Sequence, residues 1–278
     1  MTTPVAAPPA HTAESLRFLA AWVHRESGIA LDQDKNYLLE ARLLPITEEL
    51  QLESLDALCA ALRNDRSPAL KKKIVEAMTT HETFFFRDAS FFDALRNDVL
   101  PQLIGRRQTS RTLHVWSAAT SSGQEAYSLA MLLLEMGLDN WHVRVLGTDL
   151  SEQILLKARE GLYAQMEVNR GLPARCLVRY FDRCGIDWRV RDSVRRMVTF
   201  EPFDLRHSAR GKGPFDVILC RNVLIYFDVA TRKKIVQELR GVLSADGYLV
   251  LGSTESIMHL ESDFKPVAGS GIALYQVS

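Results

Sequence analysis

The sequence predicts an α/β fold in which an N-terminal helical domain precedes a doubly wound, mostly parallel Rossmann-like sheet. Three observations support this prediction. Apolar residues recur at helical spacing from residue 12 to about 80, strand-like and helix-like segments alternate beyond residue 100, and one strand runs into small residues before a helix begins. We expect a helical domain at 1–80, a linker contributing to the ligand site at 81–90, and the α/β domain at 91–278.

The composition is that of a globular chain without a dominant charge. The 278 residues are 47% hydrophobic, and 34 basic residues balance 34 acidic ones, so no global field favours nucleic acid or an anionic membrane. No apolar run reaches the roughly 18 residues of a membrane span. The N-terminus, with Pro4, Pro8 and Pro9 and no basic lead, is unlike a signal peptide, which favours a cytoplasmic protein. The cysteines lack C-x-x-C spacing, so we expect neither structural zinc nor a disulfide framework.

The first 80 residues predict several short amphipathic helices. Gly28 is the expected end of the first, and Ser67-Pro68 the expected start of the last. Pro45 and the loop at 64–67 are expected to separate the helices between them. The run of lysines at 71–73 indicates a solvated face, with contact to a substrate left open.

The segment that joins the two domains combines aromatic and charged residues. The three phenylalanines at 84–86 fit no single amphipathic face, so we expect them to bridge packed surfaces, with at least one lining a pocket between the domains. Arg87 beside them would be partly desolvated, and its fork suits a carboxylate of a substrate or cofactor. Pairing of Arg87 with Asp88 or Glu82 is the alternative.

The rest of the chain alternates between helices and strands. A helix containing Phe91, Phe92, Leu95 and Val99 is expected to end at Pro101. Strands are expected at 113–117, 143–147, 197–200, 215–220, 248–252 and 273–277. For the last strand, an antiparallel direction is left open. Helices are expected at 124–136, 152–160 and 231–243.

Residues from 161 to about 198 interrupt this alternation and predict an inserted subdomain. It should hold a helix around 173–184 and a short strand at 188–190. Between 170 and 196, eight arginines stand against three aspartates, a balance of eight minus three, or +5. This favours an acidic protein surface as partner rather than nucleic acid, although a solvated face with internal ion pairs explains the pattern equally well.

The turn that follows the strand at 113–117 is the most informative feature. Small residues at 118–123 let a ligand approach the backbone, and the helix that follows offers unpaired amides. The turn lacks G-x-G-x-x-G spacing, and Glu125 would repel phosphate and attract a cation. The expected ligand therefore carries positive charge and no phosphate, as S-adenosylmethionine does. An ordinary loop with a surface glutamate is the alternative.

Further polar residues follow the other expected strands. Asp149 is placed to accept hydrogen bonds from both ribose hydroxyls; its alternative role is a helix cap, for which Ser151 is better suited and would leave Asp149 free. Asp204 suits an adenine amino group, with the Leu205 amide facing a ring nitrogen, although a surface turn is equally compatible.

Asn222 and Tyr226 follow the strand expected at 215–220. The side chain of Asn222 can both donate and accept, and Tyr226 offers a hydroxyl near the reacting group.

Together these segments resemble a known family. THETFFFRD, VWSAATSSGQEAYSLAM, GTDLS, FDVILCRNVLIYFD and GYLVLGSTES look like the motifs of CheR-type chemotaxis receptor methyltransferases, in the same order and over nearly the whole chain. The resemblance implies an S-adenosylmethionine-dependent protein-glutamate O-methyltransferase without a metal. It would form glutamate methyl esters on the cytoplasmic helices of chemoreceptors during adaptation, without inserting into the membrane, and release S-adenosylhomocysteine.

The resemblance also assigns site residues. It implies cofactor contacts at His81, Thr83, Arg87, Glu125, Asp149, Asp204, Leu205, Arg221 and Asn222, with Arg87 and Tyr226 nearest the chemistry. Two positions depart from the family pattern: His81 stands where asparagine is usual, and Gln124 where a glutamate often precedes Glu125.

The inserted subdomain of the family can dock a tethering pentapeptide of the receptor with an edge strand and a glycine-containing loop. Here the stretch 181–188 looks short in that loop, so we expect tether-independent binding.

The expected chemistry follows from charge. A glutamate with a pKa of about 4.3 is already a nucleophile at neutral pH and needs no general base. In a water-poor crevice where the two halves meet, Arg87 and Tyr226 would hold the carboxylate, and Glu125 and Asp149 the cofactor. Two rivals are a non-catalytic receptor-binding adaptor with the same fold and a methyltransferase acting on a small molecule or RNA.

Overall fold

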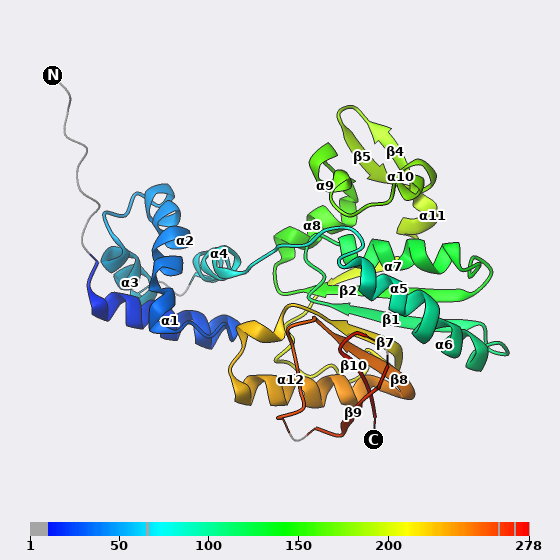
Figure 1. The fold of residues 1–278 in the computed structure, drawn as a ribbon. Helices are drawn as coiled ribbons and strands as arrows, with labels where there is room; N and C mark the ends of the chain where they lie inside the picture. Colours follow the sequence, from blue (N-terminus) through cyan, green and yellow to red (C-terminus); the bar gives the residue numbers. More distant parts are fainter. Residues whose placement is uncertain (1–10, 65–66, 261, 270, 278) are drawn as a thin grey trace. The chain divides into compact units, whose positions relative to one another are not determined.

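The structure, a computed structural model, describes residues 11–64, 67–260, 262–269 and 271–277. The chain forms two units, one of residues up to Thr80 together with Tyr226–Asp228, the other of His81–Ile225 and Val229–Ser278 (Figure 1). The prolines considered at the N-terminus, Pro4, Pro8 and Pro9, lie outside the described residues, as do Asp65 and Arg66 of the predicted loop. Within the described ranges, no helix is both long and apolar enough to cross a membrane.

The first unit is helical and has its own core. Its elements are α1 (Ala13–Ser27), η1 (Gln33–Lys35), α2 (Asn36–Glu49), α3 (Leu55–Asn64) and α4 (Pro68–Met78). Both predicted boundaries are confirmed: Gly28 ends α1 in a left-handed conformation with φ 77°, and Ser67 precedes Pro68 at the start of α4. In the lysine run, Lys73 forms an ion pair with Glu49 of the same unit.

Pro45 does not separate two helices, and that expectation is wrong. Helix α2 continues through Pro45 to Glu49. A proline removes one intrahelical hydrogen bond, but Leu43 and Ile46 beside it are buried in the core of this unit. Burial of these side chains outweighs the loss of that bond.

The second unit is built on a sheet with the strand order β6-β2-β1-β7-β8-β10-β9. The strands are β1 (Thr112–Ala118), β2 (His142–Asp149), β6 (Val198–Pro202), β7 (Phe215–Cys220), β8 (Leu243–Leu251), β9 (Phe264–Pro266) and β10 (Leu274–Val277). Pairing is parallel from β6 to β8, and β10 is antiparallel to both β8 and β9. The predicted fold class is confirmed, and within this sheet β9 is a strand that the sequence did not indicate.

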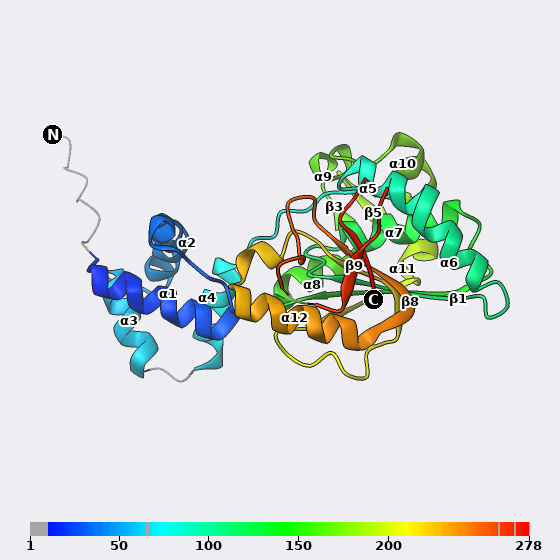
Figure 2. The same ribbon diagram turned by 60° about the horizontal axis from the view of Figure 1, so that its bottom comes forward.

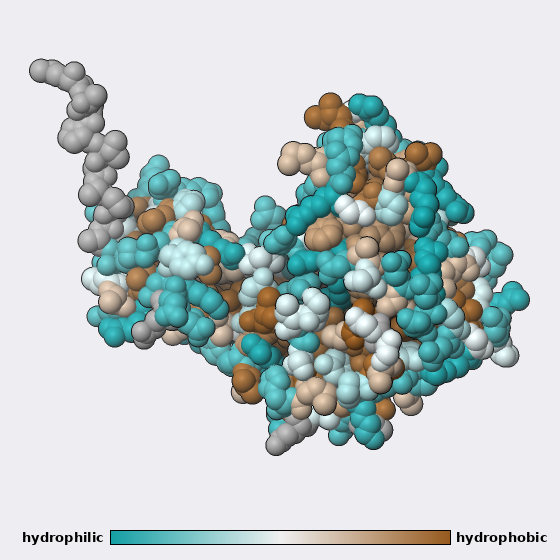
Figure 3. All heavy atoms as spheres, in the orientation of Figure 1, coloured by the Kyte–Doolittle hydropathy of each residue, from teal (hydrophilic) through white to brown (hydrophobic). Residues whose placement is uncertain are grey.

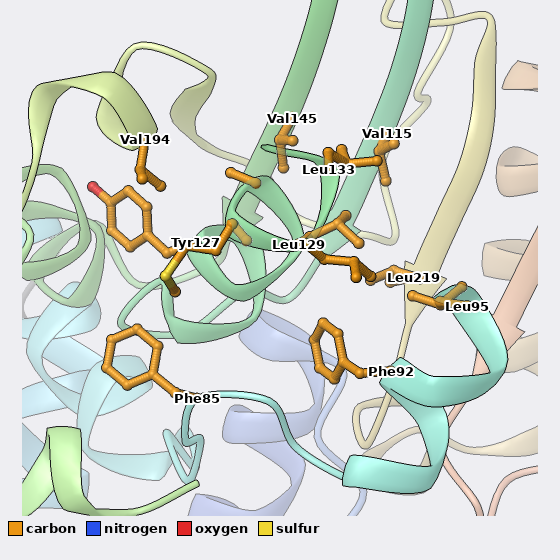
Figure 4. Packing of buried hydrophobic residues seen from close by; sticks show 14 of the residues in the cluster. Phe85, Phe92, Leu95, Val115, Tyr127, Leu129, Leu133, Val145, Val194 and Leu219 are labelled. Atoms are coloured by element: carbon orange, nitrogen blue, oxygen red, sulfur yellow. The ribbon is translucent and has the colours of Figure 1, made fainter. Parts of the chain in front are cut away.

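Helices cover both faces of this sheet. They are α5 (Ala89–Ala94), η2 (Leu95–Val99), α6 (Leu100–Arg106), α7 (Gln124–Glu135), α8 (Glu152–Glu160) and α12 (Val229–Val242), with the 3-10 turn η3 (Leu224–Tyr226) after β7. Helix α7 lies on one face and α12 on the other (Figures 1 and 2). Leu129 and Leu133 of α7 pack among Val115 of β1, Leu219 of β7 and Phe92 of α5 (Figure 4). Because the strands from β6 to β8 are parallel, their carboxyl ends lie at the same edge of the sheet, and polar residues follow them there.

Pro101 does not end the helix before it, contrary to expectation. The helical course passes from α5 through the π-helical turn η2 into α6. Pro101 occupies the first turn of α6, where a missing N–H is tolerated. Leu100 and Leu103 on either side are fully buried, which favours continuation.

The inserted subdomain contains the predicted β structure. It consists of β3 (Leu162–Tyr163), α9 (Gln165–Asn169), α10 (Ala174–Tyr180), β4 (Phe181–Cys184), β5 (Asp187–Val190) and α11 (Asp192–Arg195), with the sheet order β3-β5-β4. The helix expected around 173–184 is shorter, because the buried Phe181 starts β4 and packs edge-on against Phe85 at 5.5 Å.

The surface of the insert mixes paired charges and apolar side chains. Arg170, Arg175, Arg191 and Arg195 form ion pairs with Glu82, Glu135, Asp182 and Asp192, respectively. The alternative of internal ion pairs therefore accounts for part of the arginine cluster. Apolar side chains also lie on its outer surface (Figure 3), where Met166, Val178 and Ile186 are exposed.

Close packing behind β2 yields a prediction about stability. A Cβ atom at Gly147 would lie 2.7 Å from two ring carbons of Phe200 and 3.1 Å from Cγ2 of Thr120. We expect Gly147→Ala to lower the free energy of unfolding by about 1–3 kcal/mol, since an overpacked core must shift. Urea titration followed by circular dichroism measures this.

Gly105 in α6 is the matched control. A Cβ there would meet nothing within 4 Å. Gly105→Ala should leave stability unchanged or raise it by up to about 1 kcal/mol, because alanine favours the helix. Equal stability of the two variants would contradict the close contact at Gly147.

Candidate functional site

The turn between β1 and α7 has a strained backbone at the carboxyl edge of the sheet. Ala119 and Ser121 have φ values of 63° and 55°, and Gly123 has 91°. Residues other than glycine rarely adopt this region, so surrounding contacts must hold the turn. The hydroxyl of the buried Tyr163 donates to the carbonyl of Ser122 at 2.6 Å, and the amide of Thr120 donates to the carbonyl of Thr148 at 2.8 Å.

Asp149 closes the same turn from the end of β2. Its Oδ2 accepts the amide of Ser121 at 2.8 Å, and its Oδ1 accepts the amide of Ser151 at 3.1 Å. Asp149 is buried, with 8% of its surface exposed. Burial raises the pKa of the Asp149 carboxyl, although these two amides act in the opposite direction.

Ser151, rather than Asp149, caps the helix that follows this strand, as expected. Its hydroxyl accepts the Ile154 amide at 3.2 Å. The Asp149 carboxylate instead accepts the Ser121 and Ser151 amides and so organises the turn. Each carboxylate oxygen still has a second lone pair that can accept a ligand hydroxyl.

Glu125, in the first turn of α7, is paired with a buried cation of the protein itself. Its Oε1 accepts the hydroxyl of Ser117 at 2.7 Å, and its Oε2 accepts an N–H of Arg221 at 2.8 Å. The side chains of Glu125 and Arg221 are 12% and 3% exposed. The negative charge predicted at this position is therefore present and partly neutralised by Arg221.

Arg221 connects β7 with the segment that precedes α5. Its guanidinium donates to the carbonyl of Arg87 at 2.5 Å and lies 3.4 Å from Oδ2 of Asp88. Its Cζ stands 3.8 Å from the centre of the Phe91 ring. This buried side chain thus fixes where residues 87 and 88 run relative to the end of the sheet.

The side chain of Arg87 is half-buried, and its alternative partners are engaged elsewhere. It donates to the backbone carbonyl of Glu82 at 2.7 Å and stands 5.5 Å from the Phe84 ring centre. The Glu82 carboxylate pairs with Arg170 at 2.7 Å, and Asp88 with Arg221. In the described part of the chain, Arg87 is therefore held by a carbonyl rather than by a carboxylate.

The same segment is attached to the turn by its backbone. The hydroxyl of Ser121 donates to the carbonyl of His81 at 2.9 Å, and His81 lies near enough for its charge to lower the pKa of Asp149 against the larger effect of burial. Thr83 is half-buried two residues further on.

The three phenylalanines have separate roles. Phe85 packs against Tyr163 of the insert at 4.9 Å, Phe86 against Phe92 of α5 at 4.9 Å, and Phe84 lies under Arg170 at 4.5 Å. They bridge different surfaces, as predicted. Phe84 and Phe86 line a cavity of about 310 Å³ whose other lining residues all belong to the second unit.

Asp204 and Leu205 follow β6. The Asp204 carboxylate is held by the guanidinium of Arg206, at 2.6 Å for the closest pair of atoms, and also accepts the Arg206 amide at 2.9 Å. Leu205 is buried. A ligand amino group at Asp204 would share this carboxylate with Arg206.

Asn222 and Tyr226 follow β7 but fall in different units. Asn222 has φ 56°, again in the left-handed region. Tyr226 belongs to the first unit, where it packs on the helical core and its carbonyl accepts the Ala30 amide at 2.8 Å.

One acidic residue of this edge was missed by the sequence analysis. Glu255, which is 6% exposed, accepts four backbone amides with its carboxylate. Glu255 lies within the segment GYLVLGSTES that carries part of the family resemblance, and this was the signal that could have identified it. Across the described ranges, no group of three or more His, Cys, Asp or Glu side chains is arranged to hold a metal.

The Arg221–Glu125 pair generates a prediction. Arg221→Met should lower the free energy of unfolding by about 3–5 kcal/mol, because it leaves a buried carboxylate unpaired. Adding Glu125→Gln should restore part of this loss, which a double-mutant cycle of urea titrations measures. Strict additivity of the two substitutions would show that the pair is not coupled.

Comparisons with known proteins show the family of both units. Residues 14–79 match the all-alpha domain of CheR methyltransferases, and residues 81–272 match the SAM binding domain of CheR methyltransferases. Chemotaxis protein methyltransferase 1 of Pseudomonas aeruginosa is 37% identical over 261 residues, covering 92% of this chain and 94% of that protein. Chemotaxis protein methyltransferase Cher2 of Pseudomonas putida is 36% identical over the same shares.

A third relative, chemotaxis protein methyltransferase 1 of Vibrio cholerae, is 36% identical over 270 residues, or 95% of this chain and 97% of that protein. Both the helical unit and the α/β unit are thus matched, in one continuous chain of similar length. The chain belongs to the CheR methyltransferase family.

Proposed function

We propose that this methyltransferase transfers a methyl group from S-adenosylmethionine to glutamate side chains of chemoreceptor cytoplasmic domains, forming glutamate methyl esters. Family membership and the chemotaxis methyltransferases among its relatives support methyl transfer in chemotaxis. The observation that carries the cofactor assignment is the placement of two carboxylates, Glu125 and Asp149, around a backbone turn without phosphate-binding spacing. The proposal places the enzyme in the cytoplasm, where that substrate lies.

The donor set suits S-adenosylmethionine chemically. Asp149 keeps lone pairs for the ribose hydroxyls, and Glu125, although paired with Arg221, contributes negative charge at the edge assigned to the cationic ligand. Asp204 and the Leu205 amide are assigned to adenine. His81, Thr83, Arg87, Arg221 and Asn222 complete the proposed contacts. Bound there, S-adenosylmethionine supplies a methyl group made electrophilic by its sulfonium.

The residues of the chain would bind and orient rather than transfer protons. The substrate glutamate is ionised at neutral pH, so one of its oxygens bonds to the methyl carbon while the carbon–sulfur bond breaks and its electron pair stays on sulfur. Arg87 and Tyr226 are assigned to hold the carboxylate. Opposite charges disappear in this step, so excluding water favours it.

Incubation with radiolabelled cofactor and a panel of receptor cytoplasmic fragments tests the proposal. We expect base-labile label on fragments that carry glutamates, and its loss when those glutamates are replaced by glutamine. Arg87→Ala should reduce the rate by about 100-fold or more through lost orientation. Tyr226→Phe should keep measurable transfer; abolition without weaker substrate binding would require a proton or polarisation role for Tyr226.

The adaptor and the other methyltransferase classes give different results. An adaptor would bind receptor fragments but give no heat with S-adenosylmethionine in calorimetry. A methyltransferase for a small molecule or RNA would bind the cofactor and leave every receptor fragment unlabelled.

Binding to receptors is proposed to be independent of a tethering pentapeptide. Strands β4 and β5 of the insert are joined by only Gly185 and Ile186, which is short for the peptide-docking loop of the family. Calorimetry of the protein with such a pentapeptide should show no binding at micromolar concentration. A tight complex would overturn this part of the proposal.

A further inference from the structure

Four amides from two separate loops converge on the carboxylate of Glu255. Oε2 accepts the amides of Asn222 at 2.7 Å and Gly252 at 2.8 Å. Oε1 accepts those of Val223 at 2.9 Å and Ile225 at 3.3 Å. The carboxylate therefore joins the segment after β7 to the end of β8, and it is nearly inaccessible to solvent.

These hydrogen bonds fix a backbone conformation that Asn222 would otherwise seldom adopt. With φ 56°, Asn222 directs its amide and that of Val223 towards one anion, as successive amides do in an anion-binding nest. The atoms around Gly252 are closely packed. A Cβ atom at this position would lie 2.7 Å from Oε2 of Glu255 and 2.8 Å from Nδ2 of Asn222. The Asn222 side chain is thus placed against the strand end by Glu255 and Gly252 together.

We propose that Glu255 is a positioning residue for the cofactor, acting through Asn222 without contacting the ligand. The inference rests on the proposed function, in which Asn222 contacts S-adenosylmethionine. A glutamate that only stabilised the fold would affect unfolding and leave ligand affinity unchanged. A positioning residue affects the affinity, and only while Asn222 is present.

Glu135 provides the matched control. It is another poorly exposed glutamate of the second unit, and it pairs with Arg96 and Arg175 near the C-terminal end of α7. Its partners belong neither to the turn nor to the segment after β7. Glu135→Gln should therefore lower stability and leave cofactor binding unchanged.

The experiment measures S-adenosylhomocysteine binding by calorimetry for the full chain and its variants, with urea unfolding in parallel. Glu255→Gln should weaken binding about tenfold, because its amide nitrogen faces amide donors in place of an acceptor oxygen. Glu135→Gln should bind like the wild type. In an Asn222→Ala background, Glu255→Gln should add less than about twofold, since its effect passes through Asn222.

Gly252→Ala is the second variant, because it keeps the carboxylate and displaces it. It should also weaken binding, and it replaces Glu255→Gln in the cycle if that variant does not fold. Unchanged affinity in these variants, or additive losses in the cycle, would overturn the positioning role while leaving the proposed function intact. Failure of the wild-type chain to bind S-adenosylhomocysteine would overturn the proposed function itself.

Discussion

A guanidinium buried at the edge of the sheet is the constraint on which the arrangement of this site depends. Arg221 reaches Glu125 at the start of α7, the carbonyl of Arg87 and the carboxylate of Asp88. A charge this deeply buried requires such partners, because desolvation would otherwise disfavour it strongly. Two segments far apart in the sequence, residues 87–88 and the start of α7, are thereby fixed around the end of β7.

The pairing with Arg221 reduces the negative charge that Glu125 offers to a ligand. Glu125 is not an isolated charge waiting for a cation, because Arg221 already shares its carboxylate. The edge of the sheet therefore carries one cation, Arg221, between the carboxylates of Glu125 and Asp88. Such an edge attracts a ligand with a positive centre less strongly than a bare glutamate, but it holds its own geometry before the ligand arrives.

The strained backbone of the turn between β1 and α7 is likewise held in place by buried partners. Asp149 accepts the Ser121 amide, and the hydroxyl of Tyr163 in the insert donates to the Ser122 carbonyl. Burial raises the pKa of Tyr163 well above its usual value, so it remains a hydrogen-bond donor. Phe85 packs on Tyr163, so the inserted subdomain and the segment before α5 support the turn jointly.

Sequence patterns predicted those elements that local chemistry determines. The strand at 215–220, the helix at 152–160 and the caps at Gly28 and Ser151 follow from periodicity and capping residues, and the structure has them. Pro45 and Pro101 were misjudged because the burial of neighbouring side chains prevailed over a local signal.

The site was less predictable, because its key contacts involve backbone groups brought together by folding. Asp149 binds the Ser121 amide and Glu255 the Asn222 amide, each from another loop, and no spacing in the sequence reveals such partners. The pairing of Glu125 with Arg221 spans 96 residues and depends on the adjacency of β1 and β7.

A crystal structure of the chain with S-adenosylhomocysteine tests the central claim most directly. The account predicts the adenosine at the turn formed by residues 119–123, with both ribose hydroxyls on the Asp149 carboxylate and the Arg221–Glu125 pair intact. A nucleoside bound elsewhere, with Asp149 contacting only the Ser121 and Ser151 amides, would contradict it.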